Sequence, residues 1–263
     1  MITTRRLLIC ALCTLAIVTT QAQQWPKPLP EAKAGTRWWW MGSAVDRQGL
    51  EWNLSEYAMA GIGAVEITPL YGVQGNERNE LLFLSSQWMQ ALKDVQDISQ
   101  RVGIEVDMNC GTGWPFGGPL VPIEEAACKA LFRDTVVGGT ATYTFSLGRT
   151  KQKVKRAAPG GEGWVIDHFD RQAVRHYLDR FDKAFAESGV AWPHTFFNDS
   201  YEVYGANWTP TLFDEVQKRR GHDLRQHLPG PSGRGQQGAC RLPRDTQRPA
   251  LRELYSAMGR LGP

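Results

Sequence analysis

Residues 195–203 read TFFNDSYEV, and the change of polarity inside this stretch predicts how the chain folds. The first three residues are apolar and strand-like, and Asn198, Asp199, Ser200 and Glu202 come almost directly after them. Such a run is typical of a buried strand whose carboxyl end opens into a polar loop. The stretch therefore predicts a strand that presents two carboxylates at its end.

Three earlier segments have the same character and alternate with amphipathic helices. Strands are expected at residues 36–41, 64–69 and 104–109, and helices at residues 49–60, 85–103, 170–188 and 209–220. Strands and helices that alternate with short connections indicate a parallel sheet. Together with the opening stretch they predict an α/β fold, a partial (β/α)8 TIM barrel of about the first four βα units. A β-branched segment at residues 127–145, with a Gly138-Gly139 turn, predicts a small inserted β-hairpin. Residues 149–163 are basic and Gly-rich, which predicts an exposed loop.

The first residues have the pattern of a targeting segment. Arg5 and Arg6 precede a short apolar stretch, which ends at the small-residue sequence TQA of residues 20–22. This predicts a secretory signal peptide over residues 1–22 and hence a secreted or periplasmic protein. A membrane anchor is the alternative, although the apolar stretch is short for one. After cleavage of the signal we expect no association with a membrane.

The sequence changes character again at residue 230. Residues 230–263 show no sustained periodicity and carry six Arg against two acidic residues. One interpretation is a disordered basic tail or linker. The other is a single-base insertion near Pro229, because deleting one base from a suitable set of codons gives LPALLGEGSKERADYRE, the pattern of a loop and a helix. We expect residues 23–229 to be the N-terminal half of the (β/α)8 barrel and residues 230–263 to be a frameshifted, non-native tail.

The net charge gives no support for a nucleic-acid partner. The formal net charge is +3, of which the expected signal contributes +2 and the expected tail +4, so the remainder has a net charge of −3. A mildly acidic domain lacks the basic surface that phosphate groups require. Nucleic acid is therefore not expected as a partner.

The candidate functional residues are concentrated at the carboxyl ends of the expected strands. These ends read WWWMG, VEITPLYG, VDMNCGTGWPFGG and FFNDSYEV; the first carries three aromatic rings, and each of the other three combines an acid or amide with an aromatic ring. Active sites of (β/α)8 barrels lie at the carboxyl ends of the strands. Aromatic rings stack on the C–H faces of sugars, while acids and amides bind hydroxyl groups. A carbohydrate site is therefore expected, formed by Trp38, Trp39, Trp40, Glu66, Asp107, Asn109, Trp114, Asn198, Asp199 and Glu202.

Several of these residues have a structural alternative. At least one of Trp38, Trp39 and Trp40 is expected to point into the core, because side chains alternate along a strand. Asp107 could instead be a buried acid that pairs with a backbone amide or an Arg. Trp114, in a Gly/Pro-rich loop, is better explained as part of a binding rim, and Glu202 as a functional residue.

Four long motifs carry a family resemblance. They are RWWWMGSAV at residues 37–45, AGIGAVEITPLYG at 60–72, NCGTGWPFGGPLV at 109–121 and NDSYEVYGANWTPTLFDEVQKRRGHD at 198–223. Together they resemble the start of the bacterial α-L-rhamnosidases of glycoside hydrolase family 106. The resemblance covers residues 25–229, which is the chain without its expected signal and tail.

The resemblance implies a secreted or periplasmic enzyme several times longer than this chain. It implies a (β/α)8 catalytic domain, further β-rich domains and a bound calcium ion, whose ligands cannot be identified in this sequence. The implied reaction removes terminal L-rhamnose, with inversion, from a rhamnose-containing oligo- or polysaccharide. Inversion needs a carboxylic acid and a second carboxylate. Glu202 is the candidate general acid, and Asp199 is the neighbouring charge that would help it to keep its proton.

The same resemblance predicts what the chain lacks. The later strands and the second catalytic carboxylate would lie beyond Pro229, so we expect this chain to be a truncated and inactive fragment. Two alternatives remain open at this point. One is a non-catalytic carbohydrate-binding remnant, and the other is a non-functional product of a frameshifted gene.

Overall fold

The computed structural model describes residues 29–137, 140–198, 200–221 and 223–227. The chain divides into two compact units, residues 1–33 and 34–263. In the first unit the described residues form the 3-10 helix η1 (Pro30–Ala32). The expected signal peptide and the expected frameshifted tail both lie outside the described residues.

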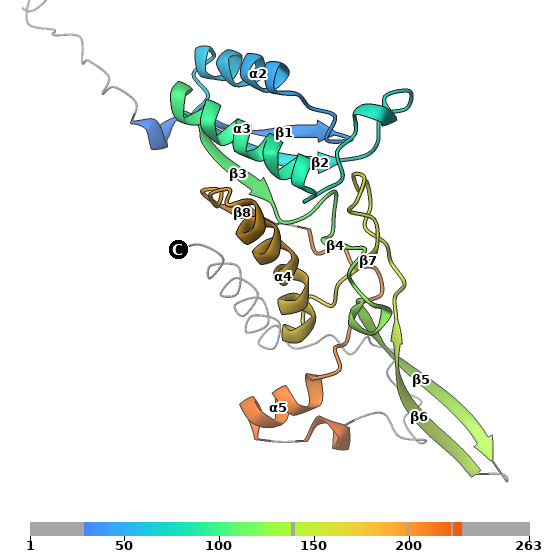
Figure 1. Cartoon of the computed structure of the whole chain (residues 1–263). Coiled ribbons are helices and arrows are strands. Elements are labelled where there is room, and N and C mark those ends of the chain that lie inside the picture. Colours follow the sequence, from blue (N-terminus) through green and yellow to red (C-terminus); the bar gives the residue numbers. More distant parts are fainter. Residues whose placement is uncertain (1–28, 138–139, 199, 222, 228–263) are drawn as a thin grey trace, which may run out of the picture. The chain divides into compact units, whose positions relative to one another are not determined.

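A four-stranded parallel sheet forms the centre of the second unit (Figure 1). Its strands, in order, are β1 (Gly35–Met41), β2 (Ala64–Leu70), β3 (Glu105–Asn109) and β8 (Phe196–Phe197). Each strand pairs in parallel with its neighbour, so the polar residues that follow the strands gather at one edge of the sheet. The predicted α/β class with a parallel sheet is confirmed.

The helices lie where the sequence predicts them because their capping residues are strong signals. Helices α2 (Arg47–Met59), α3 (Ser86–Val102) and α4 (Arg171–Ser188) begin after Asp46, Ser85 and Asp170, and each of these side chains accepts a hydrogen bond from a backbone N–H in the first turn. α3 and α4 end at Gly103 and Gly189, both in the left-handed conformation that glycine tolerates best. None of the helices within the described ranges is long and apolar enough to cross a membrane.

The hydrophobic core lies between the sheet and these three helices. In Figure 1, α2 and α3 lie side by side along the strands. The strand residues on this side are buried against them: Trp38, Trp40, Val65, Ile67, Val106 and Met108. Because side chains alternate along each strand, the intervening residues point to the other face of the sheet. That face carries the polar residues described below.

The predicted hairpin is present and is longer than expected. β5 (Cys128–Val137) pairs antiparallel with β6 (Thr140–Arg149). A second hydrophobic cluster joins this hairpin to α5 (Leu212–Arg220), with Trp208 and Phe213 packed against Phe145. The short 3-10 helices η2 (Glu77–Asn79), η3 (Ile123–Glu125) and η4 (Leu224–His227) complete the described elements.

The segment at residues 149–163, expected from its basic and Gly-rich composition to be an exposed loop, is instead packed against the sheet's loops. Val154 and Ala158 are buried, and Lys155 forms a backbone bridge with Trp114. Close by, β4 (Gly117–Gly118) pairs with β7 (Trp164–Val165). Gly113 makes this approach feasible, since a Cβ atom there would lie 2.0 Å from the carbonyl oxygen of Lys155. The exposed loop predicted from composition alone at residues 149–163 is therefore wrong.

Candidate functional site

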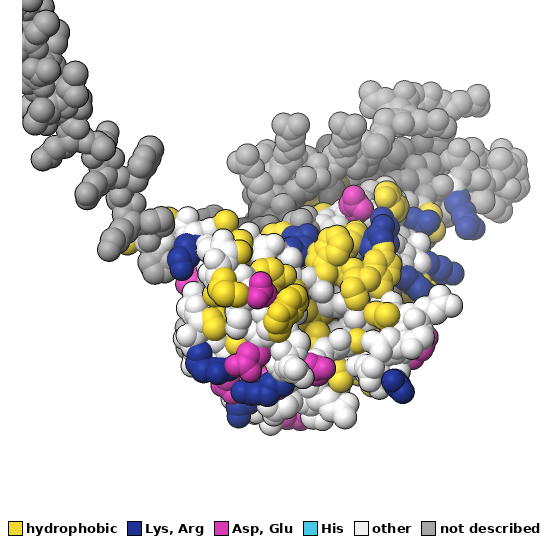
Figure 2. Space-filling model, turned by 90° about the horizontal axis from the view of Figure 1, so that it is seen from above, with side chains coloured by type: hydrophobic (Ala, Val, Ile, Leu, Met, Phe, Trp, Pro, Cys, Tyr) yellow, Lys and Arg dark blue, Asp and Glu magenta, His cyan; other side chains and the backbone are white. Residues whose placement is uncertain are grey.

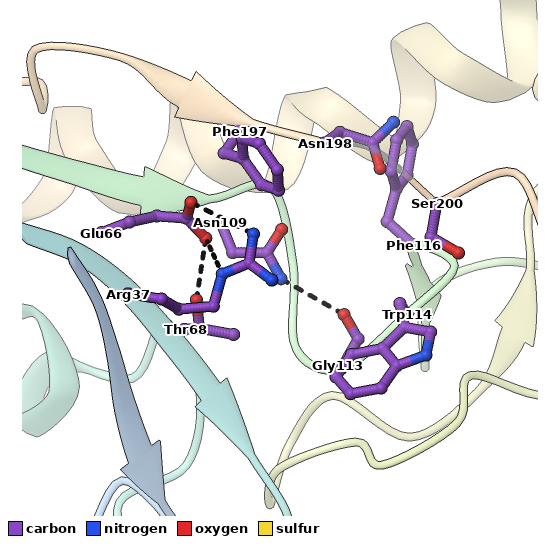
Figure 3. Close-up of a pocket in the computed structure, with 10 residues that line it drawn as sticks. All are labelled: Arg37, Glu66, Thr68, Asn109, Gly113, Trp114, Phe116, Phe197, Asn198 and Ser200. Carbon is purple, nitrogen blue, oxygen red and sulfur yellow. Dashed lines mark hydrogen bonds and ion pairs between the residues drawn. The ribbon is translucent and has the colours of Figure 1, made fainter. Parts of the chain in front are cut away.

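A pocket opens on the face of the sheet that the helices leave uncovered (Figure 3). Strands β1, β2, β3 and β8 and the loops after β3 and β8 contribute to it. Four of the residues expected from the sequence line it: Glu66, Asn109, Trp114 and Asn198. The others are Arg37, Thr68, Gly113, Phe116, Phe197 and Ser200.

The strand register brings the polar side chains of this pocket together. Arg37 of β1 is the partner of Glu66 in β2, and Asn109 of β3 is the partner of Phe197 in β8. Residues that are partners in parallel strands present their side chains on the same face. Residues more than 150 positions apart in the chain therefore meet at one place.

Glu66 is the carboxylate of the pocket, and its neighbours hold it in place. Its Oε1 atom lies 3.2 Å from Nε of Arg37 and accepts a hydrogen bond of 2.9 Å from the hydroxyl of Thr68. The Arg37 guanidinium also lies 4.7 Å from the centre of the Phe197 ring. Figure 3 shows Arg37 and Thr68 both directed at this carboxylate. Glu66 is thus presented as a fixed hydrogen-bond acceptor.

The opposite wall supplies amides, a hydroxyl and aromatic rings. Asn109 donates from Nδ2 to the carbonyl oxygen of Gly113 at 3.2 Å, which ties the loop after β3 to its strand. Asn198 donates to the hydroxyl of Tyr201 at 3.4 Å. The Ser200 Oγ atom is buried and has no hydrogen-bond partner among the described residues. Neutral polar groups beside aromatic faces suit a ligand rich in hydroxyl groups.

A neutral histidine lies behind this wall. The ring of His168 is 4.7 Å from that of Phe116, which lines the pocket, and 5.3 Å from that of Tyr201. Burial lowers the pKa of His168 to about 4, so the imidazole is uncharged near neutral pH. Next to it, burial raises the pKa of the Asp167 carboxyl to about 7. Neither side chain lines the pocket.

The structure corrects the expected position of two tryptophans. Trp38 is 6% exposed and Trp40 is 1% exposed, and both pack under the helices against Tyr57 and Trp88. Strand alternation directs them away from the pocket. Trp39, with 59% of its surface exposed, is on the pocket side and is the register partner of Thr68, but it does not line the pocket.

Asp107 is half-buried and pairs with a histidine rather than with the backbone amide or Arg of its structural alternative. Its Oδ1 atom lies 3.2 Å from Nδ1 of His194, in the segment that leads into β8. It is the register partner of Glu66 but is not among the residues that line the pocket. A role for Asp107 in sugar binding stays a prediction.

The two expected catalytic acids are not in the pocket wall. Asp199 lies outside the described residues. The Glu202 side chain is 60% exposed, and its carboxylate lies 3.2 Å from the ammonium of Lys155. Because the backbone of Lys155 is hydrogen bonded to that of Trp114, Glu202 is connected to the pocket through one residue. The roles of Glu202 and Asp199 stay predictions.

Lys155 is held by two partners at once. Its ammonium donates to the hydroxyl of Tyr204 and to Glu202, each at 3.2 Å. The hydrogen bond to Tyr204, followed by the interaction with Glu202, raises the pKa of Lys155. Lys155 is therefore a cation at any pH at which the protein would work.

The described residues contain no cluster of three or more His, Cys, Asp or Glu side chains that could hold a metal ion. The calcium ion that the family resemblance implies stays a prediction, and no chemical step is assigned to it.

One of the residues missed in the sequence had a usable signal. Arg37 alternates with Trp38 and Trp40, so a period of two places it on the face opposite the tryptophans. Phe116 and Ser200 offer no such pattern, because both lie in loops whose paths depend on tertiary contacts. Only the folded chain reveals their positions.

Comparison with solved structures finds a similar fold. The rhamnosidase from Novosphingobium sp. PP1Y superimposes with a TM-score of 0.59 and 13% sequence identity, over 89% of this chain and 44% of that one. A similarity at this identity concerns the fold. Among curated proteins, "Putative beta-glucuronidase" from Formosa agariphila is 27% identical over 139 residues, which cover 52% of this chain and 12% of that protein. The chain spans less than half the length of both relatives.

Comparison with family models gives a match over most of the chain. The model of glycoside hydrolase family 106, described as alpha-L-rhamnosidase, matches residues 26–154 and 145–237. These ranges contain β1, β2, β3, β8 and every residue of the pocket. The chain therefore belongs to glycoside hydrolase family 106.

Proposed function

We propose that this chain is the N-terminal part of the catalytic domain of an α-L-rhamnosidase and that its pocket binds the terminal L-rhamnose of a glycan. The family membership and the fold of the solved rhamnosidase support the proposal. The four parallel strands with helices on one face correspond to the first part of a (β/α)8 barrel. The uncovered face of the sheet would be the barrel interior.

One observation carries this proposal. Asn109 ends β3, Asn198 directly follows β8 and Glu66 lies within β2, and together with Trp114 they line one pocket. Several parallel strands of one sheet thus contribute to the pocket, as they do to the ligand sites of (β/α)8 enzymes. A carboxylate and two amides can bind sugar hydroxyls, and the indole ring can lie against the C–H face of the sugar.

Inverting hydrolysis would need two carboxyl groups about 6.5–9.5 Å apart. Glu66 is the one carboxylate among the described residues that line the pocket. Its carboxylate is oriented by Arg37 and Thr68, an arrangement that suits the acceptance of hydrogen bonds from a sugar hydroxyl or a water molecule. Glu202 remains our candidate for the general acid, and Asp199 remains a predicted catalytic neighbour.

Glu202 would have to change its surroundings to serve as that acid. A general acid must reach the leaving oxygen of the substrate, and the Glu202 carboxylate instead lies 3.2 Å from the ammonium of Lys155 and does not line the pocket. We propose that the glycan, on binding beside Trp114, separates Glu202 from Lys155. The leaving oxygen of the glycan would then receive the proton.

Because Glu66 is the one carboxylate that lines the pocket within the described ranges, we propose that the 263-residue chain binds rhamnosides and does not hydrolyse them at a measurable rate. This observation also favours the second candidate function, a non-catalytic rhamnose-binding protein. Secretion through the expected signal peptide, and the calcium ion of the wider family, stay predictions. The active form would then require further polypeptide that supplies the second carboxylate.

The test is a binding and hydrolysis experiment on the purified chain. Titration followed by NMR or calorimetry should detect methyl α-L-rhamnoside, and methyl β-D-glucuronide should bind at least about tenfold more weakly. An aryl α-L-rhamnoside should release no chromophore. Release of the chromophore would overturn the proposed lack of turnover, and preference for the glucuronide would overturn the proposed sugar.

A further inference from the structure

Arg156 occupies an unusual position at the rim of the pocket. Its guanidinium carbon lies 5.2 Å from the centre of the Tyr71 ring and 5.3 Å from that of the Trp114 ring. Tyr71 follows β2, and Trp114 belongs to the loop after β3. A cation that contacts two aromatic rings is held in place by both. Arg156 is therefore fixed beside Trp114, which lines the pocket.

The backbone around Arg156 is held in a conformation that non-glycine residues seldom adopt. The φ angle is +59° at Arg156 and +52° at Tyr71. The N–H of Tyr71 donates to the carbonyl oxygen of Arg156 at 2.9 Å, which links the two residues. Such conformations persist where the surrounding structure enforces them, often at functional sites. The fold thus fixes Arg156 at a cost in backbone energy.

The charge of Arg156 is not neutralised within the described part of the chain. No Asp or Glu in that part forms an ion pair with it, in contrast to Arg37, which pairs with Glu66, and Lys155, which pairs with Glu202. Lys153, on the same segment, lies 5.4 Å from the ring of Trp164 and likewise has no acidic partner among the described residues. Beside Trp114, Arg156 therefore carries a positive charge that no acidic side chain of the described ranges neutralises.

From these contacts we infer that Arg156 recognises an anionic group, a carboxylate or a sulfate ester, on the sugar that follows the terminal rhamnose. The inference rests on the proposed function, because the rhamnose in the pocket brings the next sugar to the rim. A guanidinium presents a planar fork of donors that matches carboxylate and sulfate oxygens. Its two aromatic contacts leave less side-chain freedom to lose on binding.

The inference concerns specificity and not the chemical step. Arg156 does not line the pocket and would not touch the bond that is cleaved. The inferred substrate class is a glycan in which rhamnose is attached to a uronate or to a sulfated sugar. A glycan with a neutral sugar at this position would occupy the pocket and leave Arg156 without a partner.

The test compares three ligands that differ at one group. Calorimetry on the 263-residue chain would use the methyl glycosides of rhamnosyl-glucuronate, rhamnosyl-glucose and rhamnosyl-glucose 6-sulfate. We expect at least one anionic disaccharide to bind about tenfold or more tightly than the neutral one. Comparison of the uronate with the sulfate identifies which anion is recognised. The preference should decrease as salt is added, because the contact is exposed.

Variants assign the preference to this side chain. Arg156→Asn removes the charge while keeping a residue type that tolerates positive φ, and it should abolish the preference. Arg156→Lys keeps the charge without the fork and should retain part of it. Arg101→Gln is the matched control, since Arg101 belongs to the last turn of α3 and pairs with Glu51. It should leave the preference unchanged.

Failure of this inference is distinguishable from failure of the proposed function. Equal affinity for all three disaccharides, or a preference that survives Arg156→Asn, overturns the inference and leaves rhamnose binding in the pocket intact. If no disaccharide binds, both the inference and the proposed function are overturned. Thermal unfolding of each variant near the parent temperature verifies that the fold is retained.

Discussion

Arg37 and Glu66 are register partners across β1 and β2, and their Nε and Oε1 atoms lie 3.2 Å apart. The pair sits on the face of the sheet that the helices leave uncovered. The side chain of Glu66 is 15% exposed and that of Arg37 is 40% exposed. A strand neighbour therefore sets the orientation of the carboxylate before a ligand arrives, which lowers the cost of ordering it.

Replacing Arg37 should weaken ligand binding more than it weakens the fold. Arg37→Gln leaves Glu66 with Thr68 as its remaining partner, so the carboxylate becomes less well oriented. We expect the affinity for methyl α-L-rhamnoside to fall about 3- to 10-fold, and the free energy of unfolding by less than about 1 kcal/mol because the pair is partly exposed. Calorimetry and urea unfolding measure the two effects. A loss of stability without a loss of affinity would assign the pair to the fold alone.

Truncation of the adjacent residues Trp39 and Trp40 of β1 should change the free energy of unfolding by very different amounts. Trp40 is almost completely buried against Trp88, so Trp40→Ala should lower the free energy of unfolding by about 3–5 kcal/mol. Trp39 is 59% exposed, and Trp39→Ala should change the free energy of unfolding by less than about 1 kcal/mol. Urea unfolding followed by circular dichroism compares them. Similar losses would show that the face assignment of β1 is wrong.

Substitutions at Gly113 and Gly189, which have similar φ angles, distinguish the energetic cost of backbone strain from that of steric overlap. Gly113 has φ +55° and Gly189 has φ +64°, but a Cβ atom at Gly113 would lie 2.0 Å from the Lys155 carbonyl oxygen, whereas Gly189 faces open space. Gly189→Ala should cost about 1 kcal/mol, as expected for a left-handed position. Gly113→Ala should cost clearly more and should also weaken rhamnoside binding, because it separates Trp114 from Lys155. Equal costs at both sites would contradict the close approach of these two loops.

The pH dependence of stability offers a test of Asp167 and His168. The pKa of Asp167 is raised from 3.8 to about 7, chiefly by burial, against the N–H of Phe169 and the charge of Arg149. The folded state then binds a proton that the unfolded state has lost, so this group makes stability fall as the pH rises from about 4 to 7. The pKa of His168 is lowered from 6.5 to about 4, again by burial. This group makes stability rise over nearly the same window.

In the parent chain, Asp167 and His168 have opposite effects on the pH dependence of stability. Asp167→Asn removes the contribution of Asp167 and should leave that of His168. Asn keeps an acceptor for the Phe169 N–H, which Asp167 binds at 3.0 Å. The stability of this variant, relative to the parent, should increase between pH 4 and pH 6.5, with a slope of up to about 1.4 kcal/mol per pH unit. Urea unfolding at four pH values measures it. Parallel curves for variant and parent would mean that Asp167 is not titrating in this range.

Much of the fold could be predicted because its signals are local. Asp46, Ser85 and Asp170 mark helix starts, and Gly103 and Gly189 mark helix ends, through hydrogen bonds and backbone angles that depend on a few neighbours. The apolar runs of β1, β2 and β3 likewise indicate a sheet that is buried against helices. The packing of residues 149–163 was missed, since it depends on Gly113 and Gly117, which accept another backbone at close range.

The site was predicted in part, and the errors have physical causes. Asn109, Trp114 and Asn198 follow from the rule that parallel strands end at one edge of a sheet, whereas Glu66 lies within β2. Trp38 and Trp40 were included because the three consecutive tryptophans were not divided between the two faces. Arg37 was missed although its alternation with Trp38 and Trp40 places it on the pocket face. Ser200 was missed because the path of its loop depends on tertiary contacts.

The most direct test is the binding of methyl α-L-rhamnoside to the 263-residue chain and to two glutamate variants. Glu66→Gln removes the charge from the pocket, whereas Glu105→Gln removes one from the opposite end of β3, where Glu105 is 52% exposed. The proposed site predicts that the parent and Glu105→Gln bind the rhamnoside equally well and that Glu66→Gln binds it at least about tenfold more weakly. Absence of binding by the parent chain, or unchanged affinity in Glu66→Gln, would contradict it.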